Sequence, residues 1–177
     1  AAGRLSQAIL QAAYVVADHT TFAWLGLEAL RIWLKHGPSR TLLAPATAAA
    51  TVALHGDYAA GYQAMRRIVA LGEARGYEPE TSYTRYRFAL LACWFEPIEN
   101  AVHAVQRARA GLIAGGELAY AGYTYHSRLY YLLDCAPSLD SCVAEIEAGL
   151  AFARRTGGEQ VAQLIDGYRW LAGVLRG

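Results

Sequence analysis

The sequence lacks an uncharged stretch long enough to cross a lipid bilayer. The longest one, Thr41 to Gly56, is about one turn shorter than the roughly 20 apolar residues of a spanning helix, and it is mostly alanine. No membrane-spanning helix is therefore predicted. Residues 1–17 superficially resemble a signal peptide, but Gln7 and Gln11 fit poorly in its apolar core, so we expect an amphipathic helix there.

An excess of charge of one sign is also missing. The chain has 16 basic and 15 acidic residues, and Lys35 is its single lysine. A dedicated nucleic-acid binder carries a strong basic excess, so a polyanion partner is disfavoured, although a local basic patch remains compatible with this balance. We expect neither a nucleic-acid nor a membrane partner.

Cysteine and histidine are scarce and show no metal-ligand spacing. Three cysteines, Cys93, Cys135 and Cys142, are an odd number, which favours a reduced, cytoplasmic compartment. Cys135 and Cys142 flank a predicted turn, where small core residues are favoured over a redox pair. The five histidines are scattered without an i,i+4 pair, so no metal and no cofactor are predicted.

Recognisable nucleotide-binding and catalytic motifs do not occur. The sequence contains no GxxxxGK[ST], GxGxxG, GxSxG or HExxH. His126 and Arg128 have no orienting carboxylate or nucleophile near them in a known arrangement. We therefore predict that this chain is not an enzyme. The absence of a start methionine suggests a piece of a longer protein.

Turn signals recur in the sequence about every 40 residues. Gly37, Gly76, Gly116 and Gly157 mark one set of turns, and signals near residues 18, 55, 96 and 136 fall midway between them. Each period holds two helices of about 18 residues, which is typical of an α-solenoid of the tetratricopeptide or HEAT kind. We predict an all-α, right-handed superhelix of about nine helices, as four antiparallel pairs and a last helix, in one domain over residues 1–177.

Apolar residues at helical spacing predict the buried faces of these helices. The predicted buried positions are Tyr58, Tyr62, Met65 and Val69; then Ile98, Ala101, Val105, Ala108 and Leu112; then Val143, Ile146, Leu150 and Ala153. In the helix over about 21–36, the buried side is predicted to hold Trp24, Leu27 and Leu34, and the polar stripe Glu28, Arg31 and Lys35.

Several residues fit the ends of the predicted helices. Asp57 and Ser138 suit N-caps, and Pro97 suits the first helical position. The left-handed C′ position is predicted for Gly37, Gly76 and Gly116. Pro45 conflicts with a helix interior, so we expect a kink or a late helix start there.

Two helix starts repeat an order of glycine, acid, small residues and tyrosine. They are GDYAAGYQ at 56–63 and GGELAYAGYTY at 115–125. Stacked helices must approach closely, so we interpret Gly61 and Gly122, with their alanine neighbours, as packing positions where an adjoining tyrosine fills the remaining gap.

Two first helices of the predicted pairs are rich in tyrosine and arginine, a composition typical of binding hot spots. First helices line the concave face of a solenoid, where partners usually bind. The candidate binding residues are Tyr83, Tyr86, Arg87, Tyr123, His126, Arg128 and Tyr130. The alternative is that these tyrosines only fill gaps between repeats.

Three stretches, WLKHGPS, LHGDYAAGYQAM and CWFEPIENAVHAVQRARAGLIAGGELAYAGYTYHSRLYYLL, resemble the helical-repeat region of large bacterial signalling proteins. The resemblance runs from about Leu25 to Leu133 and weakly to the end. In that family an AAA-type (STAND) ATPase precedes tetratricopeptide-like helices, and GAF and histidine-kinase domains commonly follow, sometimes with a Ser/Thr kinase in front. Pro45 departs from the unbroken Ala- and Tyr-rich helix usual there.

The resemblance implies a cytoplasmic, non-catalytic sensor or scaffold segment that relays between an ATPase and an output domain. Its partners would be protein segments, flanking domains of the same chain or a small-molecule inducer. The alternative is a stand-alone α-helical domain that binds or transforms a small molecule.

Overall fold

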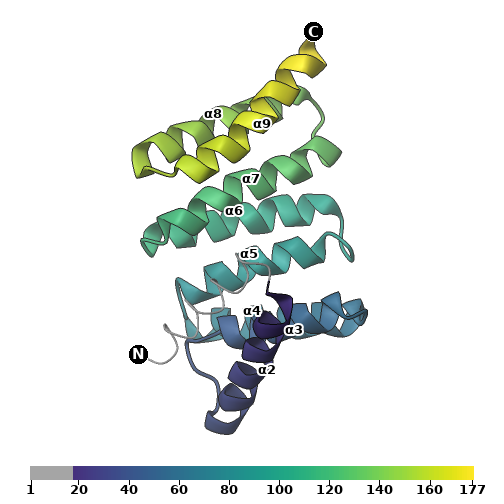
Figure 1. The fold of residues 1–177 in the computed structure, drawn as a ribbon, viewed down its shortest axis with the longest axis vertical. Coiled ribbons are helices and arrows are strands. Elements are labelled where there is room, and N and C mark those ends of the chain that lie inside the picture. The colour runs from purple at the N-terminus through teal and green to yellow at the C-terminus, as the bar shows by residue number, and fades with distance from the viewer. Residues whose placement is uncertain (1–17) are drawn as a thin grey trace. The chain divides into compact units, whose positions relative to one another are not determined.

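A computed structural model describes residues 18–177, and every regular element in this part is a helix (Figure 1). The eight helices are α2 (His19–His36), α3 (Leu43–Leu54), α4 (Tyr58–Arg75), α5 (Glu80–Ala92), α6 (Ile98–Ala114), α7 (Leu118–Cys135), α8 (Leu139–Thr156) and α9 (Glu159–Arg176). The prediction of an all-α fold is confirmed. The helix expected over residues 1–17 lies outside the described residues.

The chain divides into two compact units, Ala1–Leu91 and Ala92–Gly177. In the described part of the first unit, α3 packs against α2 and α4. In the second unit, α6 packs against α7, and α7 also packs against α8 and α9. None of the described helices combines the length and the apolar character that crossing a membrane requires.

Pro45 lies in the first turn of α3, which begins at Leu43. The first N–H groups of a helix have no acceptor within the helix, so a proline there removes no hydrogen bond. Of the two outcomes expected at this position, the late helix start is the one observed. Leu42, Ala46 and Ala49 then join Met65 of α4 in one buried cluster.

The predicted buried side of α2 is wrong. Trp24 and Leu34 are 63% and 67% exposed, and Leu27 is exposed as well, whereas Phe22 and Gly26 are buried. A Cβ atom on Gly26 would lie 2.8 Å from Thr47 Cγ2 of α3, so only the glycine side of α2 can approach α3 this closely. The helix is apolar on two sides, and its amphipathic pattern could not distinguish them.

The polar stripe of α2 is confirmed. Glu28 and Arg31 form an ion pair on the surface with an N to O distance of 2.6 Å, and Lys35 is exposed. Arginine and glutamate three residues apart lie one above the other on a helix, which explains the pair.

The predicted buried faces of α4, α6 and α8 are largely confirmed. The predicted positions that are buried are Tyr62, Met65, Val69, Ala101, Val105, Ala108, Leu112, Ile146, Leu150 and Ala153. Tyr58 is 52% exposed, contrary to the prediction, because it is the first residue of α4 and precedes the turn that contacts α3. Ile98 and Val143 are half-buried.

Glycines end several helices, as predicted. Gly76 and Gly157 are left-handed C-caps, and Gly116 also has a positive φ. Gly37 has φ 82° and ψ 170°, so it does not have the left-handed helical conformation expected there. Asp57 caps α4 by accepting a hydrogen bond from the Ala60 N–H at 3.0 Å. Pro97 precedes α6 as its N-cap, one position earlier than expected, and Ser138 precedes α8 without a side-chain cap bond.

Gly61 and Gly122 lie where helices approach closely, as the repeated motif predicts. A Cβ on Gly61 would be 2.6 Å from Ala53 Cβ and 2.7 Å from the Ala49 carbonyl oxygen. A Cβ on Gly122 would be 2.9 Å from Val161 Cγ2. The two helix starts therefore share a packing requirement, since each needs a residue without a side chain at the contact.

Candidate functional site

The residues predicted to bind on α7 lie on two different sides of that helix. Tyr123, His126 and Tyr130 are spaced by three and four residues, so they share one side. Arg128 is rotated by about half a turn from them. The helix therefore separates the aromatic candidates from the cationic one.

The aromatic side of α7 meets α9. The Tyr123 hydroxyl donates a hydrogen bond to Gln160 Oε1 at 2.6 Å. Tyr168 Oη lies 3.4 Å from His126 Nε2, with the two rings edge to face and their centroids 5.5 Å apart. We call the surface made by Tyr123, His126, Tyr130, Gln160 and Tyr168 the α7–α9 face.

Tyr130 is the most accessible tyrosine of this face. Its side chain is 54% exposed and its ring stands edge to face on the buried Tyr131, with centroids 5.5 Å apart. Leu133 continues the same side of α7 and Leu164 the facing side of α9, and both are partly exposed. The face thus combines aromatic rings, aliphatic surface and uncharged hydrogen-bonding groups.

Burial changes the acid–base properties of two groups in the face. It raises the pKa of the Tyr168 hydroxyl, and the neighbouring Tyr130 adds to this effect. Burial also lowers the pKa of His126 below its ordinary value of 6.5. Both groups are therefore favoured in their neutral forms, in which the imidazole can accept a hydrogen bond from the phenol.

We expect His126 to make the second unit less stable in acid. The unfolded chain binds the proton first, so the free energy of unfolding falls as the pH drops from about 6.5 through the lower pKa of the folded state, then levels off. Denaturant titrations at about pH 7.5 and 5 should show a smaller loss of stability in His126→Gln than in the parent. Equal losses in the two proteins would contradict the effect of burial.

Arg128 belongs to a buried ion-pair cluster instead of the binding surface. Its guanidinium pairs with Glu145 of α8, which is 5% exposed and also pairs with Arg109 of α6. Arg109 Nε donates to Thr124 Oγ1 at 2.9 Å, and its Cζ lies 3.5 Å from the centroid of the Tyr125 ring. We call these residues the Glu145 cluster. One carboxylate here joins three helices.

The sequence of α8 contains a signal for this cluster. Glu145 falls within the apolar stripe of α8, between buried Cys142 and Gly149 and next to Ile146. A carboxylate in such a stripe must be paired when it is buried. Its partners, however, are 36 and 17 residues away in the chain, at Arg109 and Arg128.

The candidate residues of α5 lie in the first unit. Tyr83 is 4% exposed, and Arg87 Cζ lies 5.5 Å from the centroid of its ring. Tyr86 is half-buried. The neighbouring Arg85 pairs with Glu73 of α4 at 2.9 Å, which ties the two helices together. Tyr83 is therefore mainly a packing residue.

The cysteines are placed as small packing residues. Cys142 is buried, Cys93 and Cys135 are half-buried, and none of the three forms a disulfide within the described part of the chain. Burial raises the pKa of each thiol, and Glu99 and Asp134 raise that of Cys135 further. Residues 18–177 hold no group of three or more His, Cys, Asp or Glu side chains arranged for a metal ion.

The α7–α9 face is thus the best-formed candidate for binding, with Arg128 removed from it and Gln160 and Tyr168 added. Compared with models of protein families, with curated proteins and with solved structures, the chain has no match.

Proposed function

We propose that this chain is a non-catalytic sensor or scaffold segment of a signal-transduction protein, and that its second unit binds a protein segment on the α7–α9 face. One observation carries the proposal. The accessible Tyr130 shares a side of α7 with Tyr123 and His126 and lies near Tyr168 of α9. Hydroxyl and imidazole groups therefore border apolar ring surface on this face. Tyrosine in such surroundings is typical of interface hot spots.

The arrangement of helices supports a repeat architecture for this role. In the second unit α7 packs against both α8 and α9, so one helix meets the next two in the chain. We propose that the pairs stack as a tetratricopeptide-like, right-handed solenoid, in which first helices such as α7 and α9 line the binding surface. On the basis of the resemblance to bacterial signalling proteins, we propose that the chain is cytoplasmic and relays between an ATPase and a kinase or other output domain.

Peptide selection with a matched pair of tyrosine variants tests this function. Displayed peptides are selected on the full chain, and their affinities are measured for the parent, Tyr130→Ala and Tyr58→Ala. Tyr58 is the control because it is 52% exposed, against 54% for Tyr130, and lies on α4 of the first unit.

We expect Tyr130→Ala to weaken binding at least tenfold, as truncation of a hot-spot tyrosine does, and Tyr58→Ala to leave it unchanged. Equal losses in both variants, or no enriched peptide at all, would refute the α7–α9 face as the binding surface.

A further inference from the structure

A cavity of about 160 Å³ lies in the second unit where the start of α7, the end of α8 and the start of α9 meet. Small residues border much of it: Ala119 and Gly122 from α7, Ala153 from α8, and the turn Gly157–Gly158. Phe152 and Val161 supply apolar walls. A cavity of about this size lined by apolar groups can hold a benzene ring.

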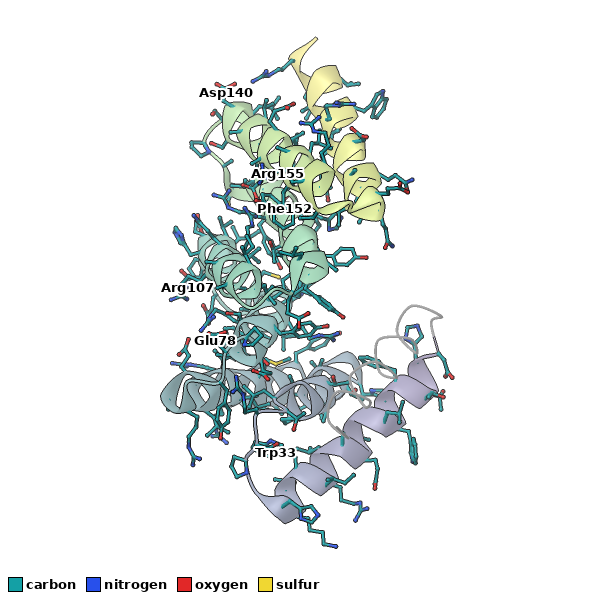
Figure 2. The ribbon with its side chains drawn as sticks, turned by 90° about the vertical axis from the view of Figure 1, so that its left-hand side faces the viewer. Trp33, Glu78, Arg107, Asp140, Phe152 and Arg155 are labelled. Carbon is teal, nitrogen blue, oxygen red and sulfur yellow. The ribbon has the colours of Figure 1, made fainter. Side chains whose placement is uncertain are left out.

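Phe152, the aromatic residue of the cavity wall, packs against Tyr125 of α7. Phe152 extends from α8 toward α7 (Figure 2), and its ring centroid lies 5.3 Å from that of Tyr125. Tyr125 is fixed in turn by Arg109 of the Glu145 cluster, whose Cζ lies over the Tyr125 ring at 3.5 Å from its centroid. The contact with Tyr125 therefore holds the ring of Phe152 in place at the cavity wall.

Thr156 brings a hydrogen-bond acceptor to this apolar lining. Its hydroxyl donates to the Phe152 carbonyl oxygen at 3.0 Å, so its proton is used within α8. Oxygen lone pairs of the hydroxyl stay available to a ligand that donates a hydrogen bond.

Charges of both signs flank the cavity. Glu117 directly precedes α7 and Glu159 is the first residue of α9, whereas Arg154 and Arg155 lie in the last turn of α8. Neither sign is in excess there, and an apolar lining cannot replace the hydration of an ion. A neutral ligand suits the surroundings best.

We propose that this cavity binds a small, neutral, monocyclic aromatic molecule that carries one hydrogen-bond donor, such as a phenol. The ring lies against Phe152 and Val161, and the donor bonds to Thr156 Oγ1. This site is separate from the exposed Tyr130 and does not rest on peptide binding by the α7–α9 face.

Titration of the full chain with phenol and with toluene tests the proposal, because the two molecules have nearly the same shape and differ in the donor. Binding is followed by the NMR signals of the Val161 methyl groups. In the parent, phenol should shift them saturably. In Thr156→Val the ratio of phenol to toluene affinity should fall roughly fivefold, which corresponds to one hydrogen bond.

A second variant fills the cavity without touching the core. Ala119 is exposed at the lining, so Ala119→Leu should abolish binding of both molecules, whereas Ala148→Leu, at an exposed site on α8, should not. Tyr130→Ala should also leave phenol binding intact, which separates this site from the peptide surface.

The outcomes are distinct. Saturable phenol binding that Ala119→Leu removes and Thr156→Val weakens supports the site. No saturable shift at Val161, or binding unaffected by Ala119→Leu, overturns it. Tighter binding of N-acetyltyrosinamide than of phenol would overturn a free small molecule as the ligand, since the ring would then belong to a partner's tyrosine side chain.

Discussion

Replacing Glu145 with alanine is expected to lower the free energy of unfolding by about 3–5 kcal/mol. The carboxylate is 5% exposed and pairs with Arg109 and Arg128, whose side chains are 12% and 23% exposed. Its removal leaves two guanidinium groups in a poorly hydrated space without their shared counter-charge. Urea denaturation of the full chain, followed by circular dichroism, measures the loss.

Two comparisons test the cause of that loss. Glu147→Ala changes an exposed glutamate on the same helix, so its effect should stay within about 0.5 kcal/mol. A triple variant with Arg109→Met, Glu145→Leu and Arg128→Met removes all three charges and should recover most of the stability, because no unpaired charge remains. A loss below about 1 kcal/mol in Glu145→Ala would show that the cluster does not form in solution.

Gly61→Ala is expected to destabilise the protein by about 1–3 kcal/mol, although alanine is the better helix former. The added Cβ would be 2.6 Å from Ala53 Cβ and 2.7 Å from the Ala49 carbonyl oxygen. Because a backbone atom is one of the two obstacles, α4 can admit the methyl group only by moving away from α3. Thermal and urea denaturation of the variant measure the cost.

Gly167→Ala is the matched control for this substitution. Gly167 is exposed within α9, and a Cβ there would meet no atom within 4 Å. The control should gain about 0.5–1 kcal/mol, because alanine loses less backbone freedom on folding than glycine does. Gly122→Ala should fall between the two, since its nearest obstacle is a side-chain atom, Val161 Cγ2, at the longer distance of 2.9 Å. A gain in Gly61→Ala would mean that α3 and α4 are not in close contact.

The order and the ends of the helices could be predicted because their causes are local. Gly76 and Gly157 adopt the left-handed conformation that ends α4 and α8, and Asp57 caps the start of α4 through an N–H three residues further on. Burial along α6 also followed its own pattern, since that helix has one apolar side.

For the candidate site, the sequence predicted which residue types α7 contains, but not which side of the helix binds. Tyrosines, His126 and Arg128 stand together in the sequence of α7, but a helix distributes neighbours over all its sides. The partners that decide their roles, Gln160 and Tyr168 for the aromatic side and Glu145 for Arg128, come from other helices.

The sequence by itself therefore determined that residues 18–177 are mostly helical, about where the helices end, and that Gly61 and Gly122 allow close approach, because turn chemistry and helical period act over a few residues. Only the tertiary structure decided that Gly26 and not Trp24 faces the core, and that Arg128 turns to Glu145 while Tyr130 faces solvent. These choices depend on contacts between distant segments, where the fit of one helix surface against another selects among sides that look alike in the sequence.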